Sequence, residues 1–289
     1  MGTLMDRSPP VHARVVESRG CGQSPARHAA VLLMSHEDDS MDIADFYALQ
    51  TGPAPLGSGA PAKLTVHDLG NLRVPSGNVG ACDPFVSLEY PLVVQVPPGD
   101  FPVRVTVADV SEEQDGSHLR EAYLSLVLSE ADSVTVEAVP GPDGPPPPGH
   151  YFTVGVDAGT VAFVDAKAVK RCMPDATTWY EGVFDSDEAD SWFSRMDADG
   201  PHPAGTANIV MPLASNGENI VLSHSGWGDG FYWLLQTKDA EGNLTGIHVD
   251  LAVVGKFDEE PNDDKEAPTD AVSTVEKSKK SWLANLLRR

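Results

Sequence analysis

The chain has 289 residues, with 20 Lys and Arg against 43 Asp and Glu, so its formal net charge at pH 7 is −23. This charge argues against nucleic acid as a partner, because phosphate backbones are bound by Lys and Arg. A small molecule or a protein that is cationic, neutral or bridged by a metal fits better. No uncharged apolar stretch approaches the roughly 18 residues of a membrane helix.

Length allows one large domain or two small ones, and a hydrophobic content of 41% is enough for a core. The three cysteines, Cys21, Cys82 and Cys172, are far apart, which is typical neither of a disulfide framework nor of a zinc site. The apolar run 29–34 is shorter than the core of a secretory signal and is followed by acidic residues. We therefore expect a cytoplasmic protein.

Residues 1–61 are rich in Pro, Gly, Ser and Arg, and this composition predicts a poorly ordered arm. One short helix is expected within it, over residues 40–50, with Ser40 as its cap. The segment 51–61 has the composition of a linker.

Residues 62–256 form one expected globular domain in which short apolar runs are separated by Pro and Gly turns. Four consecutive prolines at 145–148 predict an exposed, extended loop, because proline cannot pair within a central strand. Period-two or β-branched patterns predict strands over 92–96, 101–110, 119–128, 133–139, 151–156 and 160–164, the last two folded about a turn at 157–159.

A helix is expected from Asp165, which takes the N-cap position, and a second over 186–196. Two further strand pairs are expected, 208–213 with 219–223 and 230–237 with 244–254. The predicted fold class is therefore α+β, dominated by an antiparallel, sandwich-like β-sheet with two or three short helices.

The C-terminal part divides by charge. Residues 257–275 are mainly acidic and predict a solvated tether. Residues 276–289 predict a short basic amphipathic helix. This helix either frays or folds back on the acidic body, or it makes a weak contact with a membrane or a partner protein.

Three motifs carry a family resemblance: 76–84 (SGNVGACDP), 155–160 (GVDAGT) and 225–230 (SGWGDG). Together and in this order they resemble the family known as domain of unknown function 4241. The resemblance also takes in the turn at 97–99, the run 122–128 and the hairpin with Asp239, 242–244 and Asp250, and it covers roughly 69–254. It implies little about activity, since the family is uncharacterised.

Four aspartates at turns or strand ends, beside small residues, are candidate metal ligands: Asp83, Asp157, Asp165 and Asp229. Two carboxylates about 4 Å apart repel by roughly 4 kcal/mol at an effective dielectric of 20. A cluster of them would require a divalent cation or a raised pKa, and Mg²⁺ or Ca²⁺ would be the expected ion. For each single Asp, the alternative is that it forms a turn with its own backbone.

A hydrolytic reading adds His224 as a base and Ser225 as an assisting group, with Trp227, Gly228 and Gly159 in contact with the ligand. Adjacent residues of a regular strand point to opposite faces, so His224 and Ser225 are not expected to pair as base and nucleophile. Trp227 could equally pack against the sheet.

The run 152–160 mimics a phosphate loop of actin-like ATPases, but too few residues follow it for that two-lobed fold. The sequence gives no other signal for a nucleotide or a redox cofactor. Two hypotheses remain. One is a divalent-cation-dependent site, a metal-dependent hydrolase if catalytic, and the other is a non-catalytic β-rich module that binds a protein or a small molecule.

Overall fold

The computed structural model describes residues 14–15, 32–35, 41–141, 144–186 and 188–255. The predicted acidic tether (257–275), the predicted basic helix (276–289) and most of the predicted arm before residue 41 lie outside the described residues. Antiparallel strands arranged in two sheets dominate the described part, and this confirms the predicted α+β class.

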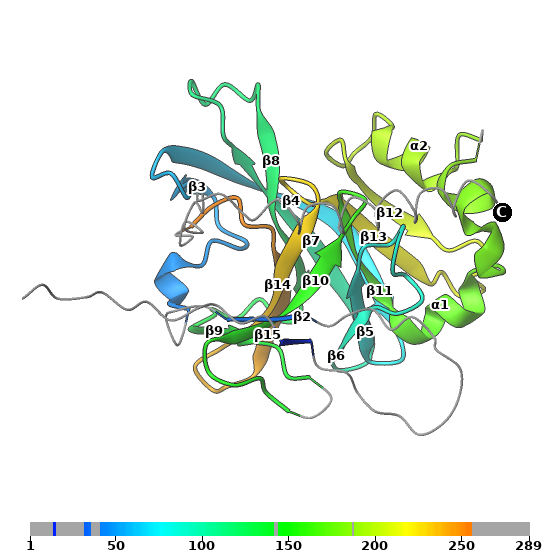
Figure 1. Cartoon of the computed structure of the whole chain (residues 1–289), viewed down its shortest axis with the longest axis horizontal. Coiled ribbons are helices and arrows are strands. Elements are labelled where there is room, and N and C mark those ends of the chain that lie inside the picture. The colour runs from blue at the N-terminus through cyan, green and yellow to red at the C-terminus, as the bar shows by residue number, and fades with distance from the viewer. Residues whose placement is uncertain (1–13, 16–31, 36–40, 142–143, 187, 256–289) are drawn as a thin grey trace, which may run out of the picture. The chain divides into compact units, whose positions relative to one another are not determined.

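The larger sheet curls into a half-barrel and has the strand order β1-β2-β10-β14-β15-β8-β7-β4-β3, with β9 paired to β14 (Figure 1). Its strands are β1 (Arg14–Val15), β2 (Leu32–Ser35), β3 (Gly52–Pro55), β4 (Pro61–Val74), β7 (Gly99–Asp109), β8 (Leu119–Val127), β9 (Thr135–Ala138), β10 (His150–Val156), β14 (Gly230–Lys238) and β15 (Leu244–Asp250).

The smaller sheet has the order β12-β13-β11-β5-β6. Every pairing in it is antiparallel, and β11 lies at its centre between β13 and β5. The strands are β5 (Asn78–Cys82), β6 (Leu92–Gln95), β11 (Thr160–Asp165), β12 (Thr206–Val210) and β13 (Asn219–His224).

Alternate side chains of β11 belong to two different cores. Val161 and Phe163 are buried in the core shared with the larger sheet, whose strand β4 contacts β11. Ala162 and Val164 are buried in a second core on the opposite face of the smaller sheet. This is the period-two placement expected of a strand that is covered on both sides.

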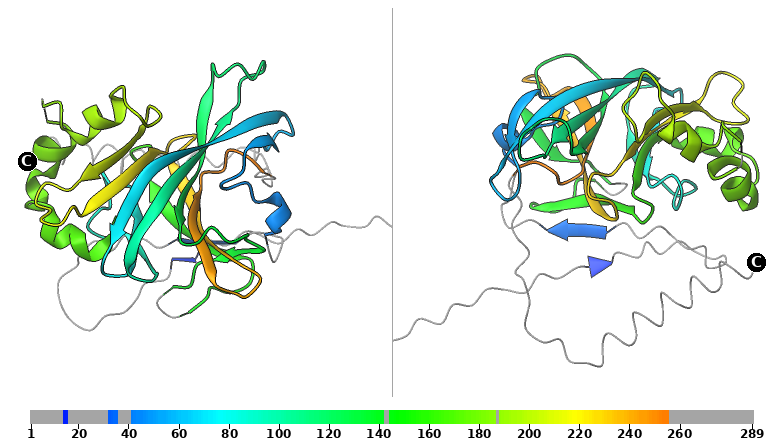
Figure 2. Two further views of the ribbon diagram at one scale, coloured as in Figure 1. Left: turned by 180° about the vertical axis from the view of Figure 1, so that it is seen from behind. Right: turned by 90° about the horizontal axis from the view of Figure 1, so that it is seen from above.

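The helical segments cover the outer face of the smaller sheet, away from the larger one (Figures 1 and 2). Trp192 and Met196, four residues apart, are both buried in this second core. The segments are α1 (Ala166–Cys172), the 3₁₀ turn η2 (Ala176–Thr178), the π-helical turn η3 (Tyr180–Phe184) and α2 (Trp192–Asp197). Among the described residues, no helix is long and apolar enough to cross a membrane.

The chain departs from expectation before residue 62. Instead of a helix over 40–50 there is one 3₁₀ turn, η1 (Ile43–Asp45), whose N-cap is Asp42. Within the expected linker 51–61, Gly52–Pro55 forms β3 and pairs with β4. Because β3 is an edge strand, its prolines cost no ladder hydrogen bonds, which is why a composition typical of linkers is compatible with a strand.

The strands on either side of the turn at 157–159 do not form a hairpin. β10 pairs with β14 and β2 in the larger sheet, whereas β11 pairs with β13 and β5 in the smaller one. The turn therefore carries the chain from one sheet to the other, and the candidate site is built around this crossing.

Candidate functional site

Asp83 holds the crossing turn. Its Oδ2 accepts the backbone N–H groups of Asp157 at 2.9 Å and Ala158 at 2.7 Å, and its Oδ1 accepts that of Phe85 at 3.0 Å. The side chain is fully buried. Burial raises the pKa of Asp83, although the three N–H donors act in the opposite direction. The carboxyl group thereby fastens the turn to the end of β5.

Asp229 meets the same turn from the other side, because its Oδ1 accepts the N–H of Gly159 at 3.2 Å. Asp157 is exposed, and its charge contributes to the raised pKa of Asp83. The structure thus brings Asp83, Asp157 and Asp229 to one turn, although they are distant in sequence.

Asp165 does not join them, because it ends β11 at the far end from the turn, roughly 16 Å away at the usual rise per residue. Its Oδ1 accepts N–H groups from Lys167 at 2.9 Å and Ala168 at 3.1 Å, and the hydroxyl of Ser76 at 2.7 Å. Asp165 is therefore the N-cap of α1, as the sequence predicts.

The two buried aspartates, Asp83 and Asp165, use their lone pairs to accept backbone and hydroxyl donors, and a cation would have to compete with these donors. Within the described residues, no group of three His, Cys, Asp or Glu side chains is arranged to hold a metal ion. The carboxylates that point to solvent here are those of Asp157 and Asp229.

A pocket of about 400 Å³ lies beside the crossing turn. Five of the residues that the sequence singles out line it, and they come from the turn and from the end of β13. These five are Gly159, His224, Ser225, Trp227 and Gly228.

Ser225 and His224 lie side by side in sequence but have different surroundings. Ser225 is buried, and its hydroxyl donates to the carbonyl of Gly228 at 2.7 Å. His224 is exposed, and its ring lies so close to Gly205 that a Cβ there would be 2.3 Å from Nδ1. The serine hydroxyl therefore stabilises a turn, and the imidazole faces the pocket.

Arg120 and Glu121 of β8 also line the pocket, although no sequence motif points to them. The register between β7 and β8 shifts here, since Thr106 pairs with Tyr123 but Val107 pairs with Glu121. The extra residue, Ala122, marks a β-bulge, a feature that re-aims neighbouring side chains. In the sequence, the only signal that these two residues contribute to a site is that they form a charged pair at the start of an otherwise apolar strand.

The pocket combines opposite charges in a partly buried setting. Glu121 is only 9% exposed, and burial raises its pKa, while the nearby His224 and Arg120 lower it. The guanidinium carbon of Arg120 lies 5.3 Å from the ring centroid of Trp227, a cation–π distance, and the ring is 54% exposed. The Nε atom of Arg120 is buried and has no hydrogen-bond partner among the described residues.

Residues of α2 also line this pocket. Phe193 and Met196 are apolar, and Asp197 contributes a carboxylate. One pocket therefore offers a cation, two carboxylates, an imidazole and an apolar patch.

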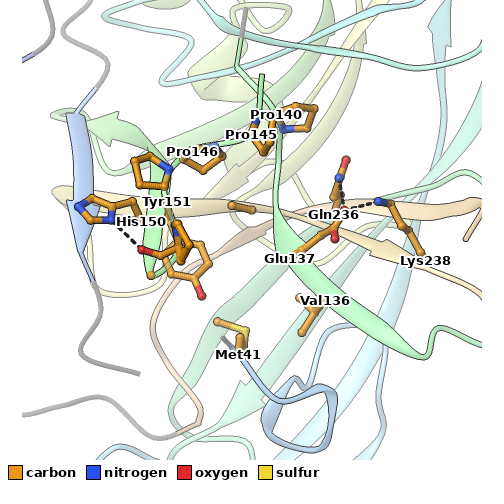
Figure 3. A pocket seen from close by; sticks show the side chains of 14 residues that line it. Met41, Val136, Glu137, Pro140, Pro145, Pro146, His150, Tyr151, Gln236 and Lys238 are labelled. Carbon is orange, nitrogen blue, oxygen red and sulfur yellow. Dashed lines mark hydrogen bonds and ion pairs between the residues drawn. The ribbon is translucent and has the colours of Figure 1, made fainter. Parts of the chain in front are cut away.

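Further hollows lie elsewhere on the described part of the chain. Asp157 and Asp229 open onto an apolar groove of about 900 Å³, lined also by Phe152 and Phe231. The predicted proline loop borders a third hollow of about 490 Å³. In Figure 3 the proline rings lie on one side of this third hollow and three polar side chains on another, where Glu137 accepts from Gln236 at 2.6 Å and pairs with Lys238.

The fold and the pocket together define a β-rich protein with a mixed-charge pocket at the crossing between its two sheets. The sequence matches the family described as protein of unknown function (DUF4241) over residues 72–278, so the chain belongs to that family. The match confirms the resemblance carried by the three motifs and extends further toward the C-terminus. No curated protein and no solved structure matches the chain.

Proposed function

We propose that this chain is a non-catalytic binding protein whose pocket beside His224 takes a small zwitterion with an apolar side chain, such as an α-amino acid. The observation that supports this most directly is the pair Arg120 and Glu121, which bring opposite charges to one partly buried pocket. A zwitterion would place its carboxylate near Arg120 and its ammonium near Glu121.

The remaining walls fit such a ligand. Phe193 offers apolar surface for its side chain beside the almost fully buried Met196, and the ring of Trp227 is exposed for further contact. A volume of about 400 Å³ leaves room for an amino acid with one more residue attached.

A binding role is favoured over hydrolysis by a serine nucleophile because the hydroxyl of Ser225 donates to the carbonyl of Gly228 and not to His224. The alternative is the divalent-cation site. It would have to rest on the exposed carboxylates of Asp157 and Asp229, since Asp83 and Asp165 accept donors from the protein.

Isothermal titration calorimetry of the full chain tests the proposal. The probe is L-leucine, and its matched controls are 3-methylbutylamine, which lacks the carboxylate, and 4-methylpentanoate, which lacks the ammonium. We expect L-leucine to bind and each control to bind at least about tenfold more weakly, because each loses one charge-assisted contact. Equal binding of all three molecules, or of none, would contradict the proposal.

The variant Glu121→Gln keeps the side-chain shape and removes the charge. We expect it to weaken the binding of L-leucine at least about tenfold. The matched control is Arg104→Gln, which removes a charge from a side chain of β7 that pairs with Glu130. The affinity for L-leucine should stay unchanged in this control variant. An equal loss of affinity in both variants would contradict a direct contact between L-leucine and Glu121.

A further inference from the structure

Cationic side chains are sparse in this acidic protein, and they are unevenly placed. Only nine Lys and Arg residues occur between residues 41 and 255, and three of them line one pocket of about 550 Å³. These three are Arg73, Lys167 and Arg171. The pocket is distinct from the one beside His224, and the two share no lining residue.

The three cations come from two elements. Arg73 lies near the end of β4, whereas Lys167 and Arg171 lie four residues apart on α1 and so share one face of that helix. The short segment after β4 (Pro75 and Ser76) and the turn between β12 and β13 complete the walls.

Two of the three cations have a carboxylate within 4 Å, but neither is hydrogen-bonded to it. The Nε atom of Arg73 is buried without a hydrogen-bond partner among the described residues, and its nearest carboxylate oxygen, on Asp100, is 3.6 Å away. Arg171 lies 3.9 Å from Glu218, too far for a hydrogen bond. No ion pair of Lys167 occurs within the described part of the chain.

The charges of the lining residues sum to an excess of two positive units, because Glu218 is the one acidic side chain among them. Glu218 is almost completely buried and accepts the N–H of Asn216 at 2.9 Å, so its charge is already engaged. Asp100, which lies 3.6 Å from Arg73 but does not line the pocket, offsets one of these units, so one net positive charge remains. Acidic side chains farther away are screened over about 8 Å at physiological salt.

We propose that this pocket binds the phosphate group of a small soluble molecule, with Arg73, Lys167 and Arg171 as its cationic partners. The negative charge of a phosphate group is opposite to that of the three cations, and guanidinium groups suit its oxygens because they donate in a planar fork. The volume exceeds that of a phosphate ion, so the pocket has room for the molecule that carries it.

Calorimetric titration of the full chain with inorganic phosphate tests the proposal, with acetate as the monovalent control. We expect phosphate to bind and acetate to bind at least about tenfold more weakly, because it carries half the charge. Absence of phosphate binding, or equal binding of acetate, would overturn the proposal.

The chain offers a matched set of variants on one helix. Lys167→Gln and Arg171→Gln each remove a cation from the pocket, whereas Lys170→Gln removes one from an exposed position of α1 that does not line it. We expect each of the first two variants to weaken the binding of phosphate at least about tenfold, and the third to leave the affinity for phosphate unchanged. Equal losses in all three would overturn the proposal, because they would indicate attraction to the overall charge.

Two further measurements complete the test. Thermal melting of each variant establishes that it is folded, since all three positions are exposed and should tolerate glutamine. Sedimentation with vesicles that contain phosphatidic acid, a lipid with a phosphate monoester headgroup, distinguishes a membrane source. Binding to the vesicles without binding of inorganic phosphate would overturn the assignment to a soluble ligand.

Discussion

The carboxyl group of Asp83 is fully buried and accepts three backbone N–H groups. It thereby links the end of β5 to the crossing turn. In Asp83→Asn an amide nitrogen would have to replace one of its oxygens. The amide would either face the N–H groups of Asp157 and Ala158 or give up the one from Phe85. We expect a loss of roughly 2–4 kcal/mol in the free energy of unfolding, because buried donors are left unpaired.

Urea denaturation measures this loss. The control is Asp132→Asn, which removes the same charge from an exposed position whose side chain has no hydrogen bond or ion pair within the described residues. A loss for Asp83→Asn no larger than that for the control would contradict the structural role given to this carboxyl group.

Asp250 gives the folded state a pH dependence of its own. Burial raises its pKa to about 7, and its Oδ1 accepts the N–H of Ala252 at 2.9 Å. In the unfolded chain an aspartate has a pKa of about 3.9. Between these two values the folded state holds a proton that the unfolded state releases. This contribution to stability is therefore complete below about pH 4 and is lost as the pH rises to about 7.

We therefore expect the free energy of unfolding of the natural chain to fall, relative to Asp250→Asn, by up to about 4 kcal/mol between pH 4 and pH 7. Urea denaturation of both proteins across this range measures the difference. Because other groups titrate as well, only the difference between the two proteins is informative. A constant difference would contradict the raised pKa.

At the scale of the element, the turn after β13 places Trp227 at the pocket. Gly226 has φ +66°, and a Cβ there would lie 2.7 Å from the carbonyl oxygen of Glu121. Gly228 also has a positive φ, +99°, but a Cβ there would meet no atom within 4 Å. The two glycines therefore separate the effect of backbone strain from the effect of a steric clash.

We expect Gly226→Ala to cost roughly 2–4 kcal/mol in the free energy of unfolding, because the strain and the clash add. Gly228→Ala should cost only about 1–2 kcal/mol, from strain alone. Urea denaturation of the two variants gives the comparison, and an equal or reversed order would show that the turn does not pack on β8 in this way.

Local signals in the sequence predict elements more successfully than the way elements assemble. The strand patterns and the cap at Asp165 act over a few residues, and the structure confirms them. That β10 and β11 belong to different sheets depends on pairing with strands 56 or more residues away, which no short pattern encodes.

The candidate site is subject to the same limit. The turn motifs indicate Gly159, His224 and Trp227, but Arg120 and Glu121 reach the pocket through a bulge that β-strand periodicity does not reveal. Spacing also cannot show that Asp83 meets backbone N–H groups rather than a cation, because that depends on how the two sheets close.

At the scale of the whole molecule, the binding proposal and the divalent-cation alternative predict different thermal behaviour. Ligands that bind only the folded state raise the melting temperature by mass action. On the binding proposal, millimolar Ca²⁺ or Mg²⁺ leaves the melting temperature of the full chain unchanged, whereas L-leucine raises it. A rise with either cation that Asp157→Asn abolishes would favour the metal site instead.

Amide NMR of the uniformly ¹⁵N-labelled full chain, titrated with L-leucine, shows whether the pocket at the crossing between the sheets binds a small zwitterion. We expect saturable shifts confined to three segments, namely 120–121, 158–160 and 224–228, with smaller ones along α2. Shifts that avoid these segments, or a spectrum that does not change at any concentration of L-leucine, would contradict the binding proposal.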